Sequence, residues 1–200
     1  MESELEVKFC IPTLDGVLEQ LQKNKASLHH ARTYEKNLRL DTLDEALAHK
    51  HCVLRLRWDR VARCTYKGDS EIENGVLKRR EIEFEVSNFE AARHFLEALG
   101  YHVSVMYEKF RTTYEVSGVA VVLDELPYGT FAEIEGPDAG SIQIVAAALR
   151  LNWEARCVES YLGLFMRLRD SRGFSAEHLS FDALQGMKFS PQDFGISYAD

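Results

Sequence analysis

The sequence lacks the metal-binding patterns that cysteine and histidine usually supply. Its four cysteines form no CxxC pair, so the ligand spacing of a structural zinc site is absent. The seven histidines show no HxxxH or HExxH spacing, which removes the helical motif of zinc proteases. Zinc bound by cysteine or histidine is therefore not expected, and four free thiols fit a reducing cytoplasm.

Long apolar runs and an excess of positive charge are also missing. No apolar stretch reaches the roughly 18 residues of a membrane helix, and the acidic start at residues 1–4 is unlike a signal peptide. With 24 basic and 32 acidic side chains the formal net charge is -8, which argues against general binding to nucleic acid or anionic membranes. The GxxxxGK phosphate loop is absent as well. We expect a cytoplasmic monomer or homodimer whose partner is a small molecule.

What the sequence does contain is a series of segments that alternate with the period of two typical of β-strands. Glutamates and Lys8 share one face of residues 2–10, while apolar side chains occupy the other. The same separation of charged and apolar faces occurs in residues 52–59, with two arginines, and in residues 78–86, with three glutamates. Solvated strand faces usually mix both signs with uncharged polar residues, so segregated charge favours a closed antiparallel β-barrel with a polar lumen.

The remaining segments predict further strands, several helices and a tail. Strands are expected at residues 31–41, 62–67, 103–116, 119–125 and 130–135, with a turn at residues 68–70. Helices are expected for about 14 residues after Thr13, and at residues 43–50, 88–99, 138–150 and about 155–169. The fold class is therefore α+β, a single domain over residues 1–170 followed by a weakly structured tail of unknown role at residues 171–200.

The charged faces carry a definite chemistry. The ExExK strand at residues 4–8 and the ExE pair at residues 133–135 present carboxylate oxygens, which are hard ligands suited to Mg²⁺ or Mn²⁺. Positive charge at strand spacing comes from Arg55, Arg57, Lys67, Lys109 and Arg111. Such bases neutralise phosphate oxygens, and arginine does so with two parallel hydrogen bonds. The ordered set predicts a site for a triphosphate group and divalent metal.

This ordered set resembles the CYTH family, also called triphosphate tunnel metalloenzymes, over roughly residues 2–165. The resemblance is carried by Glu4-Leu5-Glu6-Val7-Lys8, Leu40-Asp41-Thr42, Leu54-Arg55-Leu56-Arg57, Thr65-Tyr66-Lys67-Gly68, Arg80-Glu81-Ile82-Glu83, Lys109-Phe110-Arg111, Leu123-Asp124-Glu125, Phe131-Ala132-Glu133-Ile134-Glu135-Gly136 and Ser160-Tyr161-Leu162. It implies an eight-stranded antiparallel tunnel with flanking helices and metal-dependent attack on triphosphate compounds. Known activities in the family include adenylyl cyclase, thiamine triphosphatase, inorganic triphosphatase and RNA triphosphatase.

The resemblance also assigns roles to individual residues. The metal ligands, for two ions, are expected to be Glu4, Glu6, Glu81, Glu83, Asp124, Glu133 and Glu135. The phosphate-binding residues are expected to be Lys8, Arg55, Arg57, Lys67, Lys109 and Arg111. We assign Glu4, Glu6, Lys8 and Arg57 to catalysis.

Three functions remain open at this stage. The first is hydrolysis of inorganic triphosphate or of a small organic triphosphate such as thiamine triphosphate, with one metal neutralising charge and a second activating water. The second is a class IV adenylyl cyclase, in which the ribose 3′-hydroxyl attacks the α-phosphate and pyrophosphate leaves. The third is a polyphosphate-binding module without catalysis, against which the large acidic set argues. We favour hydrolysis, because no motif for reading adenine is evident.

Overall fold

The protein is built on one antiparallel sheet that closes on itself. The computed structural model describes residues 3–200, without the side chains of Ser3, Glu4, Ser70 and Glu73. The strands are β1 (Ser3–Ile11), β2 (Ser27–Asp41), β3 (Val53–Trp58), β4 (Ala62–Glu73), β5 (Val76–Val86), β6 (His102–Val116), β7 (Val119–Leu126), β8 (Gly129–Gly136) and β9 (Arg156–Cys157). They follow the order β5-β4-β3-β2-β6-β7-β8-β1-β9, and β5 also pairs with β1. That last pairing makes a ring of eight strands, which confirms the predicted closed antiparallel architecture.

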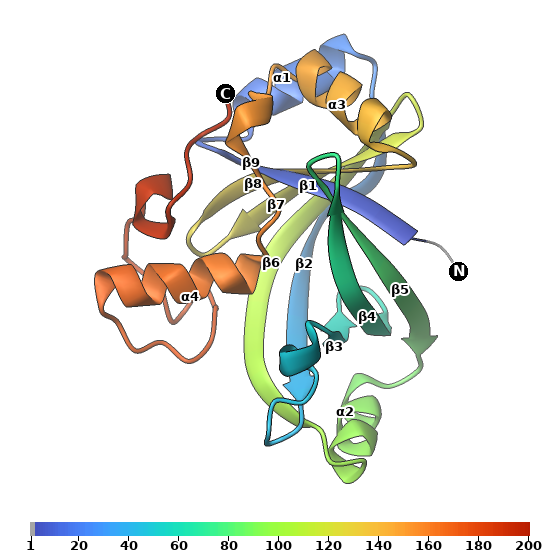
Figure 1. Ribbon diagram of the computed structural model, residues 1–200, viewed down its shortest axis with the longest axis vertical. Helices are drawn as coiled ribbons and strands as arrows, with labels where there is room; N and C mark the ends of the chain where they lie inside the picture. The colour runs from blue at the N-terminus through green and yellow to red at the C-terminus, as the bar shows by residue number, and fades with distance from the viewer. Residues whose placement is uncertain (1–2) are drawn as a thin grey trace.

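Helices flank this ring at its two ends and at one side. They are α1 (Asp15–Lys23), α2 (Phe89–Ala98), α3 (Ala139–Ala148) and α4 (Tyr161–Arg172), with short 3₁₀ turns η1 (Ala48–Lys50), η2 (Trp153–Ala155) and η3 (Pro191–Phe194). Helices α1 and α3 lie together over one end of the ring, α2 lies at the opposite end and α4 lies at the side (Figure 1). No helix in residues 3–200 is long and apolar enough to cross a membrane.

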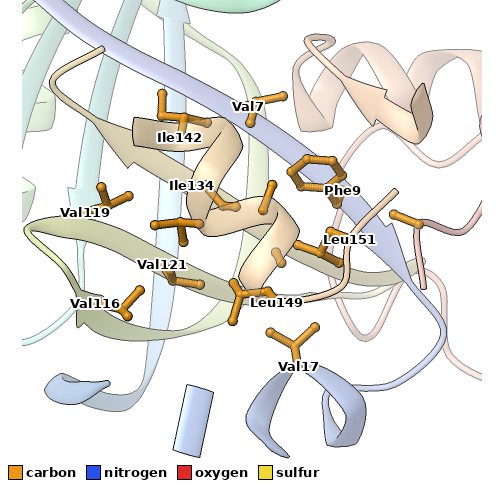
Figure 2. Close-up of a cluster of buried hydrophobic side chains, with 14 of the residues drawn as sticks. Val7, Phe9, Val17, Val116, Val119, Val121, Ile134, Ile142, Leu149 and Leu151 are labelled. Carbon is orange, nitrogen blue, oxygen red and sulfur yellow. The ribbon is translucent and has the colours of Figure 1, made fainter. Parts of the chain in front are cut away.

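The largest apolar core lies outside the ring, between its strands and the pair α1 and α3. Figure 2 shows Val7 and Phe9 of β1 and Ile134 of β8 packed with Ile142 and Leu149 around α3, all buried. Because successive side chains of a strand point to opposite faces, burying these residues outside directs their sequence neighbours into the ring. The period-two pattern thereby places the charged side chains in the lumen.

Helix α4 closes one side of the lumen. Its side chains Leu164 and Phe165 pack with Cys10 and Phe131, which occupy the same strand faces as the charged residues two positions away. The helix begins at Tyr161 because the hydroxyl of its capping residue Ser160 accepts a hydrogen bond from the Gly163 N–H at 3.0 Å. This start lies later than the predicted helix at about residue 155, since residues 156–157 pair with β1 as β9.

Three other local expectations were wrong. The predicted turn at residues 68–70 is part of β4, and the chain reverses instead at Asn74 and Gly75, whose φ angles are 52° and 81°. This is the Asn-Gly pair that two-residue hairpins favour. The expected helix at residues 43–50 is a loop ending in η1, because the Asp41 carboxylate accepts hydrogen bonds from the N–H groups of Thr42, Leu47 and Ala48. Helix α1 begins after Thr13, which does not cap it.

The C-terminal segment is better ordered than its sequence indicates. Leu179, Leu184 and Phe194 are buried against α4 and the ring. Its backbone also forms bridges from Leu179 to Tyr107 and from Tyr198 to Cys10. The segment therefore packs with α4 against the strand faces that carry Cys10 and Phe131, while the domain boundary at residue 170 stays a prediction.

Candidate functional site

The lumen contains a cavity of about 650 Å³ that is lined mainly by charged side chains. All eight strands of the ring surround it, and α4 contributes Tyr161. Of the predicted site residues, the structure places Glu6, Lys8, Arg55, Arg57, Lys67, Glu81, Glu83, Lys109, Arg111, Glu133 and Glu135 along its wall. Glu4 pairs with Arg79 in the register of β1 and β5, but its side chain lies outside the described residues.

Three carboxylates form an acidic cluster, consisting of Glu6, Glu133 and Glu135. One oxygen from each lies within 4.8 Å of the others, a spacing that one cation could bridge. The register produces this proximity, because Glu6 of β1 stands directly opposite Glu135 of β8. The donors are all carboxylate oxygens, which fit Mg²⁺ or Mn²⁺ better than a soft metal. The acidic cluster can therefore hold a divalent ion.

Lys8 lies at the edge of the acidic cluster. Its Nζ atom is 3.5 Å from a Glu133 oxygen and 4.0 Å from a Glu6 oxygen, and the side chain is buried. Burial alone lowers the pKa of Lys8, but the charges of Glu6 and Glu133 outweigh it, so the pKa of Lys8 lies above its usual value. Burial raises the pKa of Glu133 despite the attraction of Lys8. Lys8 therefore stays protonated, and it lies next to Glu133, a carboxylate whose charged form is disfavoured by burial.

Asp124 is engaged by bases and does not join the acidic cluster. Its oxygens accept hydrogen bonds from Lys109 Nζ at 2.9 Å, from Arg111 at 2.8 and 2.6 Å, and from the Tyr161 hydroxyl at 2.9 Å. Arg111 also donates to Glu133 at 2.6 Å, which links the two groups of charge. With its carboxylate fully buried and its partners in place, Asp124 orients Lys109 and Arg111; its predicted role as a metal ligand stays untested.

The opposite wall pairs its arginines with the glutamates of β5. Arg57 donates to Glu83 at 3.2 Å, while Arg55 lies 3.4 Å from Glu83 and 3.9 Å from Glu81. Lys67 Nζ is 2.8 Å from Glu81. The structure thus brings Glu81 and Glu83 to bases and not to the acidic cluster. Each of these bases is paired with a carboxylate, and an oxygen of a bound phosphate group could take the place of that carboxylate.

Strand β2 supplies lumen residues that the sequence argument missed. Glu35 is almost completely buried, with its oxygens 3.7 Å from Lys109 Nζ and 3.8 Å from an Arg57 nitrogen. Burial would raise the pKa of Glu35, but Lys109, Arg111 and Arg57 lower it below its usual value. Asn37 is also buried, and neither amide atom has a hydrogen-bond partner in the described part of the chain. Polar residues at every second position of β2, namely Glu35, Asn37 and Arg39, could have indicated this inward face. The charge of Lys36 on the other face obscured the pattern.

Comparison with known proteins identifies one matching family. The model of the CYTH domain matches residues 2–153, which includes every predicted site residue. No curated protein shows significant sequence similarity to the chain.

Solved structures with this fold come from distant organisms. A candidate adenylate cyclase from Vibrio parahaemolyticus has a TM-score of 0.73 at 21% identity, covering 82% of this chain and 98% of its own. A conserved hypothetical protein from Pyrococcus furiosus has a TM-score of 0.67 at 24% identity, covering 80% and 98%. A candidate adenylyl cyclase from Hippeastrum, described as having a dominant triphosphatase activity, has a TM-score of 0.60 at 18% identity, covering 83% and 95%. At sequence identities of 18% to 24%, these similarities show a shared fold and nothing further.

Proposed function

This chain belongs to the CYTH domain family, and we propose that it is a metal-dependent phosphohydrolase that acts on inorganic triphosphate or a small organic triphosphate such as thiamine triphosphate. The observation that carries the proposal is that Glu6, Glu133 and Glu135 lie in one cavity with buried and partly buried bases. A polyanion requires the bases, and a bound divalent ion requires the carboxylates.

The residues divide the work of such a reaction. Glu6, Glu133 and Glu135, with Glu4 on the same strand face as Glu6, would hold Mg²⁺ or Mn²⁺. The metal would neutralise phosphate charge and lower the pKa of a bound water. Lys8 touches the acidic cluster through Glu133, so it is placed to bind the phosphoryl group nearest the metal.

The remaining bases would hold the rest of the phosphate chain. Lys109 and Arg111 are fixed by Asp124, and Arg57 faces them through their shared neighbour Glu35. Bases oriented in advance stabilise developing charge without reorganising during the reaction. Helix α4 excludes water from one side of the lumen with the apolar residues packed behind Tyr161.

The cavity lining favours hydrolysis over cyclisation. Its tyrosines, among the described residues, are Tyr107 and Tyr161. The ring of Tyr161 lies 5.3 Å from both Lys8 Nζ and Lys109 Nζ. Burial would raise the pKa of Tyr107, but the nearby charges of Arg55 and Lys109 lower it below its usual value. Two lysine ammonium groups thus lie against the ring of Tyr161, which disfavours stacking of adenine on that ring. Adenylyl cyclase activity remains the alternative, because it would use the same phosphate-binding residues.

Incubation with a panel of substrates tests the proposal. The protein should release phosphate from tripolyphosphate or thiamine triphosphate in the presence of Mg²⁺ or Mn²⁺, and EDTA should abolish the release. ATP and GTP belong in the same panel, with phosphate, pyrophosphate and cyclic AMP measured together. Equimolar cyclic AMP and pyrophosphate from ATP would establish the cyclase instead. Binding of tripolyphosphate without turnover under either metal would identify a binding module, and full turnover in EDTA would refute the metal mechanism.

The variant Arg57→Ala distinguishes two roles for Arg57, binding of phosphate and stabilisation of the fold through ion pairs. Burial and the nearby Arg55 lower the pKa of Arg57, in spite of Glu35 and Glu83, so the unliganded fold gains little from this cation. We expect KM to rise by about tenfold, the typical effect of losing a hydrogen bond to a charged group. Tripolyphosphate should raise the melting temperature of the native protein more than that of the variant. A variant that melts much lower without ligand, with an unchanged KM, would show that Arg57 is structural.

A further inference from the structure

Arg39 is a lumen cation that the phosphate-binding set does not include. It lies on β2 opposite Arg55 of β3, on the strand face that carries Glu35 and Asn37, and its partly buried side chain lines the same cavity as the acidic cluster. Along β2 it is four residues beyond Glu35, a separation of about 13 Å between Cα atoms at the usual strand rise.

Arg39 differs from the six predicted phosphate-binding bases because it has no counter-ion among the described side chains. The six bases that each lie within ion-pair distance of a carboxylate are Lys8, Arg55, Arg57, Lys67, Lys109 and Arg111. Neither Arg39 nor Arg79, which lines the same cavity, forms an ion pair with any side chain that the structure describes. The nearest acidic group on its own strand, Asp41, has its oxygens committed to the backbone N–H groups of the following loop.

The groups around Arg39 are themselves donors. Burial lowers the pKa of Arg39, and the nearby cations Arg79 and Arg55 lower it further against the opposing effects of Tyr107 and Asp41. The Nε atoms of Arg55 and Arg79 are buried and have no hydrogen-bond acceptor within the described residues. Glu4 stands opposite Arg79 in the register, outside the described side chains. Buried donors of like charge favour an anion between them.

The ion-pair network fixes the end of the lumen at which Arg39 lies. Contacts run from Glu35 to Lys109, from Lys109 to Asp124, and through Arg111 to Glu133 in the acidic cluster. Among the described side chains Arg39 takes no part in this network. Along β2 it lies on the other side of Glu35 from Thr33, the residue that pairs with Arg111. A phosphate chain whose reacting group is held beside Glu133 would therefore extend toward Arg39.

Resting on the proposed function, we propose that Arg39 is a specificity-determining residue that binds the end of the phosphate chain remote from Glu133. The contribution of Arg39 to binding would then depend on the length of the phosphate chain. A short chain held at Lys8 and Arg111 does not reach it, whereas each added phosphoryl group brings the anion closer. The ligand class that best uses the lumen is a linear phosphoanhydride chain of at least three phosphoryl groups.

A chain-length series tests this inference without turnover. Calorimetry in EDTA would compare pyrophosphate, tripolyphosphate and tetrapolyphosphate with the native protein and with Arg39→Gln. We expect affinity to fall less than about twofold for pyrophosphate and at least about tenfold for the longest chain, the typical effect of one charge-assisted hydrogen bond. Arg39→Lys should recover part of the loss. Arg80→Gln, which removes an exposed arginine on the neighbouring strand position to Arg79, should match the native protein at every length.

The outcomes distinguish this inference from the function on which it rests. An equal loss at all chain lengths, or no loss at all, would overturn the role of Arg39 and leave the proposed function intact. A native protein that binds no member of the series would overturn both. Because removing an unpaired cation should not destabilise the fold, Arg39→Gln should melt no lower than the native protein without ligand; a lower melting temperature would assign Arg39 a structural role instead.

Discussion

Replacing Glu6 or Glu135 with glutamine should lower metal-dependent turnover by at least about a hundredfold, because loss of a metal ligand forfeits several kcal/mol of transition-state stabilisation. Glutamine keeps the size of the side chain and removes the charge that a divalent ion needs. The two residues face each other across β1 and β8 in the acidic cluster. Measurement of initial rates over a range of Mg²⁺ or Mn²⁺ concentrations would show the loss.

The matched control is Glu115→Gln, which changes a half-exposed strand glutamate whose partner is His29. This variant should retain native turnover and metal dependence. Titration of Mn²⁺ by magnetic resonance gives a second readout, since the cluster variants should bind the ion more weakly while the control does not. An unchanged rate in Glu6→Gln or Glu135→Gln would remove that residue from the site.

Much of the lumen was predictable because strand alternation is a local property. Glu6 and Lys8 point inward since Val7 and Phe9 pack under the helices, and the period of two in the sequence shows which residues share a face. The closure of the ring between β5 and β1 could not be predicted from the alternation within single strands. It joins residues more than seventy positions apart, and its prediction depended on the segregation of charge over many strands and on the family resemblance.

The pairing of carboxylates with bases could not be read from the sequence. Glu83, Asp124 and Glu133 are all inward acidic residues. The structure pairs all three with bases, but only Glu133 also joins Glu6 in the acidic cluster. That choice depends on which side chains meet across the lumen, and hence on the shear of the ring. Local competition explains the helix errors, as at Asp41, whose side chain holds a loop where helix periodicity was expected.

Asp124→Asn should destabilise the folded protein by about 3–5 kcal/mol, the usual cost of leaving buried charges without their partner. The native carboxylate is completely buried and pairs with Lys109 and Arg111. Burial would raise the pKa of Asp124, but these two cations hold it well below its usual range. Urea unfolding at neutral pH measures the difference, and Asp182→Asn, which changes an exposed aspartate of the C-terminal segment, is a control that should change little.

The pH dependence of this difference follows from the direction of the pKa shift. A carboxyl group with a depressed pKa contributes stability above its unfolded pKa, about 3.9 for aspartate, and loses it as pH falls toward the folded value. The gap between native and Asp124→Asn should therefore be constant from pH 7 to about pH 5 and shrink in stronger acid. Tripolyphosphate should also raise the melting temperature of Asp124→Asn more than that of the native protein, because an anion can then replace the missing charge beside Lys109 and Arg111. A variant as stable as the native protein, with no added response to tripolyphosphate, would show that Asp124 neither compensates these bases nor competes with phosphate for them.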